Sequence, residues 1–242
     1  MASEFRFTSE ITVDLVQQMG GDWMVVHAAR VSTQGSICRE DAGPESEQFG
    51  LINYLMKHRH GTPFEHGAIT FFVHAPIFVW REWHRHRIGF SYNEESGRYK
   101  QLEPVFYLPP RDRPMMKGAG WKPGRPKFLH CDSDKVYGDL CHNLKWSYEQ
   151  AYKMYEHNLS LGIDPGLARD CLPVGIYSAC WVTCNPRSLM AFLSLRTHEP
   201  TAKAFSYPLH EIEVAARKVE VSFAERWPLT YQAFVENGRQ SP

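Results

Sequence analysis

Residues 83–99 read WHRHRIGFSYNEESGRY, and this stretch decides more than any other which fold the sequence is assigned. Three arginines, two histidines, two serines, an asparagine and two glutamates crowd into a segment with little apolar content. An arginine guanidinium presents a planar fork of donors that grips a phosphate or a carbonyl edge in two places. Arg85, His86 and Arg87 are consecutive and point in several directions, which suits a convergent pocket. A solvated charged loop after an amphipathic helix is the alternative interpretation.

Helical and extended patterns alternate around this stretch. Apolar residues recur at helical spacing from Ile77 to Trp83, so a short helix should carry residues 84–87 at its C-terminal end. Asp22 follows two glycines and is expected to cap a helix towards Arg30. The order of elements, without internal repeats, predicts an α+β fold and a single domain over residues 1–242. Further helices are predicted over residues 45–57, 134–161, 185–196 and 209–225. Strands are predicted over residues 11–16, 68–75, 105–108 and 176–183. Residues 84–99 and 111–127 are predicted to be polar and irregular.

Composition and charge narrow the class of partner. The 242 residues carry 27 Lys and Arg against 27 Asp and Glu, so the formal net charge is zero, and a small-molecule partner is favoured over nucleic acid. Neither a signal region in residues 1–8 nor a long apolar run is present, so export and membrane insertion are not indicated. The six cysteines form no CxxC pair, which favours reduced thiols and a cytoplasmic location.

Two further polar sets are candidates for the same site. One lies on separate elements and consists of Arg169, Asn185, Arg187 and Arg196. Arg196 ends an apolar helix, so an ordinary arginine favoured by the helix dipole is the alternative interpretation of that residue. The other set is the turn HGTPFEH over residues 60–66, in which Gly and Pro fix the turn and Thr, Glu and His offer ligands.

Several other chemistries are disfavoured. Histidines spaced by two do not converge on a helix, and no Cys or Asp completes a standard ligand set, so we expect no metal. Cys141 falls mid-helix beside His142, where adjacent side chains diverge, so a cysteine nucleophile is not indicated. Neither GxGxxG nor GxxxxGK occurs, so side chains would have to hold the phosphates of a dinucleotide.

Five segments, in order, resemble the flavin-dependent thymidylate synthases. The triplet RHR at residues 85–87, followed by SYNEESGRY at residues 91–99, resembles the RHR…S signature of that family. A single RHR triplet would be weak evidence for the resemblance. The ordered series of segments is specific to the family and covers most of the chain. The other four matching segments are PFEH (63–66), FVWREW (78–83), ARDCLP (168–173) and NPRSL (185–189), the last followed by Leu195-Arg196.

The resemblance implies a fold and a reaction. The fold would be that family's α+β arrangement, with a central mixed or antiparallel sheet and long helices. The enzyme would be a homotetramer whose active sites lie between subunits. It would bind FAD and reductively methylate carbon-5 of the uracil of dUMP, giving dTMP, with methylenetetrahydrofolate as carbon donor and NADPH as reductant of the flavin.

The resemblance also implies roles for individual residues. Arg196 would meet the uracil edge as the catalytic residue and stabilise the developing charge by preorganised electrostatics. Ser96 has no neighbouring base in sequence, so we assign it to positioning. The expected cofactor-binding residues are His60, Thr62, Glu65, Arg85, His86, Arg87, Glu94, Asn185, Arg187 and Ala191. The expected substrate-binding residues are Glu82, Arg85, Glu94, Glu95, Ser96, Gly97, Arg98, Arg169 and Arg196.

Three positions depart from the commoner pattern. The spacing from Arg87 to Ser96 is one residue longer than usual, Ala191 stands where Asn or His is frequent, and Leu209 replaces a frequent Gln. Two alternatives therefore accompany the main hypothesis. One is the same reaction on UMP, or on both nucleotides, as in the UMP methylases of nucleoside-antibiotic pathways. The other is a flavin- or nucleotide-binding protein without methyltransferase activity.

Overall fold

The computed structural model describes residues 4–35 and 42–242. Contacts group the chain into two compact units, and each unit draws on several parts of the sequence. Unit 1 comprises the chain up to Thr12 together with His74–Glu82 and Glu94–Cys180, and unit 2 comprises Val13–Val73, Trp83–Asn93 and Trp181–Pro242. That residues 1–242 form a single domain stays a prediction. Within the described ranges, no helix combines the length and the apolar character needed to cross a membrane.

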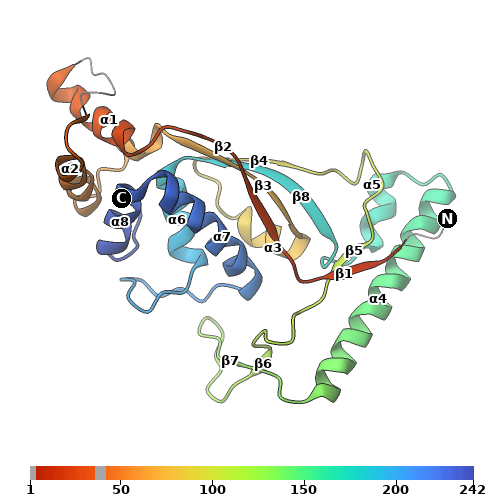
Figure 1. Ribbon diagram of the computed structural model, residues 1–242. Coiled ribbons are helices and arrows are strands. Elements are labelled where there is room, and N and C mark those ends of the chain that lie inside the picture. Colours follow the sequence, from red (N-terminus) through yellow and green to blue (C-terminus); the bar gives the residue numbers. More distant parts are fainter. Residues whose placement is uncertain (1–3, 36–41) are drawn as a thin grey trace. The chain divides into compact units, whose positions relative to one another are not determined.

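Helices and strands are mixed along the chain, as the sequence predicts for an α+β fold (Figure 1). The strands are β1 (Arg6–Thr8), β2 (Thr12–Met19), β3 (Ala68–Pro76), β4 (Phe90–Glu94), β5 (Val105–Tyr107), β6 (Met116–Lys117), β7 (Phe128–Leu129) and β8 (Tyr177–Cys184). The α-helices are α1 (Asp22–Gln34), α2 (Glu45–Lys57), α3 (Ile77–Trp83), α4 (Asp134–Ser160), α5 (Pro165–Ala168), α6 (Pro186–Arg196), α7 (His210–Arg226) and α8 (Pro228–Glu236). Two 3-10 helices are η2 (Thr62–Glu65) and η3 (Arg169–Cys171).

The strands form one four-stranded sheet and two smaller pairs. The larger sheet has the order β2-β3-β8-β4, and its strands run side by side in Figure 1. Strands β1 and β5 pair in parallel, with Arg6 opposite Val105. Strands β6 and β7 form a short antiparallel pair with Met116 opposite Leu129; β6 lies within residues 111–127, which were expected to be an irregular surface excursion, and β7 follows directly after them.

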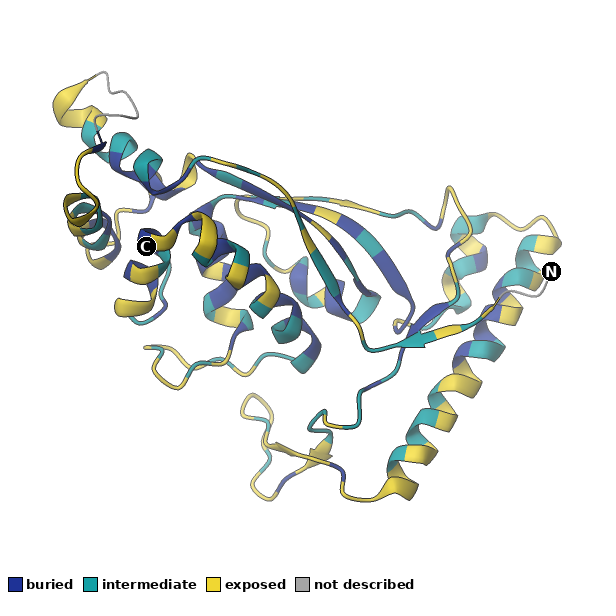
Figure 2. Cartoon of the chain, viewed as in Figure 1, coloured by how far each residue is buried: buried dark blue, intermediate teal, exposed yellow. Residues whose placement is uncertain are grey.

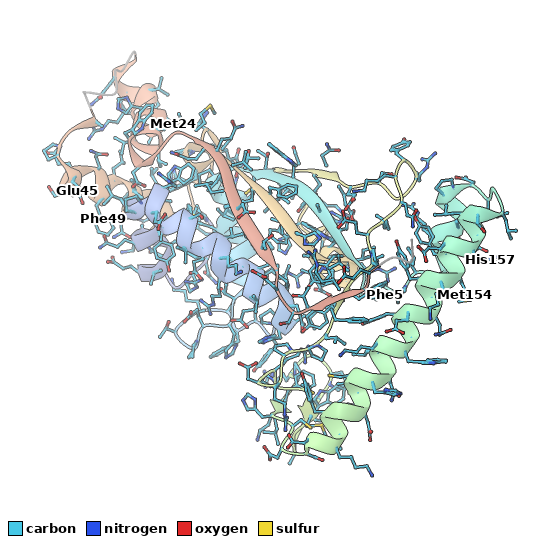
Figure 3. All side chains as sticks on the ribbon, turned by 45° about the vertical axis from the view of Figure 1, so that its right-hand side comes forward. Phe5, Met24, Glu45, Phe49, Met154 and His157 are labelled. Atoms are coloured by element: carbon cyan, nitrogen blue, oxygen red, sulfur yellow. The ribbon has the colours of Figure 1, made fainter. Side chains whose placement is uncertain are left out.

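The core of unit 1 lies between α4 and the start of β8. Tyr148, Tyr152 and Tyr155 recur at helical spacing on α4 and pack with Phe106 and Ile176. Figure 3 shows Phe5 beside α4, and its ring meets that of Tyr152 edge-on at 5.6 Å. The other face of α4 is exposed along much of its length (Figure 2).

The tyrosine hydroxyls of α4 also fix a loop. Tyr152 donates a hydrogen bond of 2.7 Å to the carbonyl of Leu102, and Tyr155 accepts one of 3.2 Å from the Leu102 amide. A buried hydroxyl loses its water and must find a partner in the protein, so these bonds define the path of the chain. The loop that carries Leu102 follows directly after residues 94–100, and it therefore holds the end of the polar stretch in place.

The core of unit 2 is formed by α6 and α7 with the base of the polar stretch. Leu189 and Phe192 on α6 are buried, as are Ile212 and Phe223 on α7. Trp83 is 1% exposed and stacks on Phe192, with ring centroids 4.9 Å apart. This stack anchors the end of α3 to α6, so the residues that follow Trp83 start from a rigid base.

The expectation for Asp22 was wrong. Asp22 begins α1, but its side chain makes no cap of that helix. The carboxylate is buried and accepts hydrogen bonds from the amides of Leu229 and Thr230, both at 2.9 Å, and from the Thr230 hydroxyl at 2.6 Å. Asp22 therefore satisfies the free amides in the first turn of α8, a helix that the sequence patterns did not predict. Burial raises the pKa of Asp22, and these hydrogen bonds partly offset the increase.

Other predicted elements agree with the structure or differ for local reasons. The helices over residues 45–57 and 134–161 match α2 and α4, and Ser133 caps α4 by accepting from the Val136 amide. The stretch expected to be irregular contains β4, because Phe90 and Tyr92 alternate with polar neighbours and stack with ring centroids 5.7 Å apart. Phe90 and Tyr92 supply a strand pattern that the surrounding charge obscured.

Candidate active site

The RHR triplet of unit 2 lies in a tight turn after α3. The amide of His86 donates to the carbonyl of Trp83 at 2.9 Å, and the hydroxyl of Tyr92 donates to the carbonyl of His86 at 2.6 Å. Arg85 and Arg87 are exposed, whereas His86 between them is half-buried. The three consecutive residues of the turn thus differ in exposure to solvent, with the histidine the least exposed.

His86 and Arg196, two predicted site residues of unit 2, are in direct contact. Nε of Arg196, the last residue of α6, donates to Nε2 of His86 at 2.9 Å. The ring of His86 also meets Phe192 edge-on at 5.0 Å. Burial, and secondly the positive charge of Arg196, lower the pKa of His86 from 6.5 to about 4. His86 is therefore neutral at physiological pH, carries its proton on Nδ1, and can accept from the guanidinium without repelling it.

We expect nitrogen-detected NMR of the imidazole to show His86 neutral at pH 6, with Nε2 unprotonated, and titrating near pH 4. Because folding lowers the pKa, the unfolded chain takes up the proton first. The contribution of His86 to stability is therefore complete above about pH 6.5 and is lost as the pH falls towards 4. Arg196→Ala should raise the pKa, while burial still holds it below 6.5. A wild-type His86 that is half-protonated at pH 6.5 would contradict this pairing.

Arg187 and the turn at residues 60–66 come together at the other end of α6. One Arg187 nitrogen pairs with Oε1 of Glu65 at 2.6 Å, and Nε donates to the carbonyl of Pro242 at 2.8 Å. The guanidinium lies so close over Gly61 that a side chain at that position would collide with it. Arg187 is thus held in one orientation by η2 and by residue 242.

Asn185 lies in the same region and caps α6. Its side-chain oxygen accepts from the amide of Ser188 at 2.8 Å and caps α6, which begins at Pro186. Gly89, in the turn after the RHR triplet, has a φ of 69° and approaches Ser188 and Asn185 too closely to admit a Cβ. His60, Thr62 and Ala191 are exposed residues of the same unit.

Unit 1 contains a separate cavity of about 330 Å³ that gathers four predicted substrate-binding residues. The cavity is lined by Glu94, Glu95, Gly97 and Arg169 and by several apolar side chains. A Cβ on Gly97 would press on Leu102 and Arg169 at 3.1–3.2 Å, so glycine allows the chain to pass close to the arginine. This cavity is the best candidate for a nucleotide site within unit 1.

The remaining predicted residues of unit 1 lie near this cavity in sequence and do not line it. Ser96 accepts a hydrogen bond of 3.3 Å from the amide of Arg98, whose side chain is exposed. Glu82, next to the end of α3, is half-buried. The carboxylate of Glu95 pairs with Lys100 at 2.6 Å, a partner that was not predicted.

The two predicted residue sets thus divide between the units. All the expected cofactor-binding residues except Glu94 belong to unit 2. All the expected substrate-binding residues except Arg85 and Arg196 belong to unit 1. Sequence reasoning missed Arg81, Asp170 and Ser178, which also line the cavity. The spacing of Ile77 and Arg81, four residues apart on α3, was a detectable signal for a shared helix face.

The described cysteines do not offer an activated thiolate. Cys184 is fully buried, and burial strongly raises its pKa. Burial also raises the pKa of Cys171, whose thiol donates to the carbonyls of Ala151 and Ala168. Cys131 and Cys180 are buried, and Cys38 lies outside the described residues. Within the described residues, no cysteine lines the unit 1 cavity.

The structure shows an α+β fold in which two groups of polar side chains, each with arginines, lie in separate units. Comparison with known proteins makes the class specific. The family model described as thymidylate synthase complementing protein matches residues 14–228. The chain belongs to this family, the flavin-dependent thymidylate synthases, and is an enzyme of that type.

Individual relatives cover nearly the whole chain. The flavin-dependent thymidylate synthase of Streptomyces avermitilis is 47% identical over 239 residues, which is 98% of this chain and 95% of the relative. That of Tropheryma whipplei is 46% identical over 237 residues, covering 98% and 97% respectively. The UMP/dUMP methylase PolB of Streptomyces cacaoi, solved with 5-Br dUMP, superposes with a TM-score of 0.90 at 41% identity, covering 98% of this chain and 100% of that chain. These matches confirm the predicted family and its α+β fold.

Proposed function

We propose that this enzyme reductively methylates carbon-5 of the uracil ring of dUMP, giving dTMP. Methylenetetrahydrofolate would supply the carbon, and NADPH would reduce the bound FAD. The observation that carries the proposal is the pairing of Arg196 with neutral His86 in unit 2. Neutral His86 fixes the position of the Arg196 guanidinium without cancelling its positive charge. A charge held in place in this way can stabilise a negative charge that develops on the substrate.

The residues of unit 2 fit a flavin dinucleotide by the chemistry of their donors. Arg85 and Arg87 are exposed cations on one turn, and Arg187 is a cation fixed by Glu65. Gly61 and Gly89 allow close backbone approach in the same unit. These groups would hold the pyrophosphate with side chains, since the sequence lacks a glycine-rich phosphate loop. We therefore keep His60, Thr62, Glu65, Arg85, His86, Arg87, Asn185, Arg187 and Ala191, with Glu94 of unit 1, as the proposed flavin-binding residues.

The remaining roles, which concern binding of the substrate, would fall to side chains of both residue sets. Arg169, with Arg98 and the Ser96 hydroxyl, would bind the phosphate of the nucleotide through charge-assisted hydrogen bonds. Glu94 and Glu95 would accept hydrogen bonds from the substrate, and Arg196 would donate to the uracil carbonyl edge. When bound and reduced, FAD would supply the hydride that the reaction needs. Glu82, Arg85 and Gly97 complete the proposed substrate site.

A second candidate substrate is UMP. PolB of Streptomyces cacaoi was solved with 5-Br dUMP and with 5-Br UMP, and this chain superposes on the two structures with TM-scores of 0.90 and 0.89. The two nucleotides differ by one ribose hydroxyl, which a pocket without a matching polar group rejects only weakly. We therefore propose UMP as an additional substrate of the same site.

The assembly and the location are also part of the proposal. A homotetramer with active sites at subunit interfaces would cover the exposed apolar residues of α4, among them Trp146 and Met154. We also propose a cytoplasmic location, because the enzyme would need nucleotide, methylenetetrahydrofolate and NADPH, which the cytoplasm supplies.

The test is a purified protein incubated with FAD, NADPH, methylenetetrahydrofolate and either dUMP or UMP. We expect a yellow protein whose flavin band bleaches when NADPH is added, followed by a product with one additional methyl group. Arg187→Ala should weaken FAD binding, and Lys203→Ala, an exposed residue of the same unit, serves as the matched control. A protein that takes up no FAD would overturn the proposal.

A further inference from the structure

A buried serine hydroxyl lies in the floor of the unit 1 cavity. Strand β8 places alternate residues on opposite faces, as all β-strands do. Ile176 and Ser178 line the cavity of about 330 Å³, whereas Tyr177 and Ala179 line a neighbouring cavity of about 190 Å³. Ser178 is 2% exposed. Its position is therefore set by the strand, and its side chain belongs to the cavity with Glu94 and Arg169.

The backbone at Ser178 is held rigidly. The indole nitrogen of Trp80 donates to the carbonyl of Ser178 at 3.2 Å and to that of Ala75 at 3.1 Å. The amide of Glu95 donates to the next carbonyl, that of Ala179, at 2.8 Å. In the part of the chain that the structure describes, no side-chain hydrogen bond joins the Ser178 hydroxyl to the protein; it is not one of the fully enclosed polar atoms that lack a partner, so it borders the space of the cavity. Leaving a buried hydroxyl unpaired is costly, so a partner from outside the chain is expected.

The surroundings of Ser178 select the kind of partner. The adjacent lining is apolar and includes Ile77, Leu102 and Leu172, while the charged groups in the lining are Arg169, Arg81 and the carboxylates. A phosphate would bind the arginines, because charge-assisted hydrogen bonds are the stronger ones. A neutral group that both donates and accepts matches either a sugar hydroxyl or the amide edge of the uracil ring. The proposed function assigns the uracil edge to Arg196, which leaves the sugar hydroxyls for Ser178.

We propose that the hydroxyl of Ser178 binds a hydroxyl of the substrate's sugar ring and thereby contributes to the choice between UMP and dUMP. This inference rests on the proposed function, which places a uracil nucleotide in the cavity. It assigns the recognition of the sugar to a residue of β8 that the motifs of the polar stretch do not include.

The test measures binding by calorimetry with FAD-loaded protein and three nucleotides: UMP, dUMP and 2′,3′-dideoxyuridine monophosphate. Ser178→Ala should weaken a nucleotide that carries the recognised hydroxyl by about tenfold and leave the others within about threefold. A loss for UMP alone identifies the 2′-hydroxyl, and a loss for UMP and dUMP but not the dideoxy compound identifies the 3′-hydroxyl. Either result supports the binding of a sugar hydroxyl by Ser178. Only the first supports a part in the choice between UMP and dUMP, and the second overturns that part, because both nucleotides carry the 3′-hydroxyl.

Two further pairs of variants separate recognition from folding. Ser178→Thr and Ser178→Val have the same shape, and only the first keeps a hydroxyl, so only the second should lose the discrimination. Cys180→Ala changes a buried residue of β8 that does not line the cavity, and it should bind all three nucleotides as the wild type does. Equal losses for all three nucleotides, or no loss for any, would overturn the role of Ser178 while the proposed function stands. A wild-type protein that binds none of the nucleotides would overturn both.

Discussion

Arg196→Ala is expected to lower the rate of methylation at least about a thousandfold while FAD binding and the reduction of the flavin by NADPH persist. The side chain lies at the C-terminal end of α6 and is held by Nε2 of His86 at 2.9 Å. A guanidinium fixed in this way needs no reorganisation when charge develops on a bound uracil, which is the condition under which electrostatic stabilisation is large. The measurement is a pair of rates, stopped-flow flavin reduction and product formation.

Two variants control for this experiment. Arg196→Lys keeps the charge and loses the planar fork, so it should recover only part of the rate. Leu195→Ala, at the exposed neighbouring position, should behave as the wild type. An Arg196→Ala protein that methylates normally once its flavin has been reduced chemically, but that NADPH reduces slowly, would refute the role in charge stabilisation.

Local signals explain why much of the fold was predictable from sequence. Asn185 followed by a proline indicated the start of α6, and the structure places the Asn185 side chain on the Ser188 amide. The helical spacing of apolar and aromatic residues predicted a helix over residues 134–161, and α4 lies there with its tyrosines packed against Phe106. In both cases the residues that decide the element lie within a few positions of one another, so the pattern contains the physical cause.

The errors come from partners that are distant in sequence. Asp22 looked like a local cap, and its carboxylate instead serves amides 207 and 208 residues away. The first turn of α8 is satisfied by that carboxylate, so the helix needs no cap residue of its own, and sequence patterns could not detect its start. Tertiary contacts of this kind override the local preference of an acidic residue after a turn.

In the candidate site, too, features that depend on neighbouring residues were predictable, and features that depend on distant partners were not. The RHR triplet and the residues after it were recognisable because they are crowded into one stretch. The link between His86 and Arg196 joins positions 110 residues apart, and the lowered pKa of His86 depends on its burial. Ser178 carries no sequence signal, since a serine in a strand is ordinary until its burial and its missing partner are known.

The segment after α8 makes a second prediction with a large effect. Arg239 is 5% exposed at its side chain and pairs with Glu220 of α7 at 2.6 Å. It also donates to the hydroxyl of Thr197 at 3.0 Å, and its carbonyl accepts from Ser194 at 2.7 Å. Its φ of 56° is unusual for a residue with a side chain, so these contacts have to compensate for backbone strain. The segment therefore fastens α6, which carries Arg187 and Arg196, to α7.

We expect Arg239→Met to lower the free energy of unfolding by about 3 kcal/mol, measured by urea denaturation. The methionine fills similar volume, but Glu220 keeps a buried charge with only Arg217, at 3.0 Å, as its remaining cationic partner. The double variant Arg239→Met with Glu220→Leu removes both charges and should recover most of the loss, because an intact buried ion pair adds little net stability. Lys218→Met, on the same helix, is the matched control and should change stability by less than about 0.5 kcal/mol. If Arg239→Met costs less than about 1 kcal/mol, water reaches Glu220 and the pair does not fasten α6.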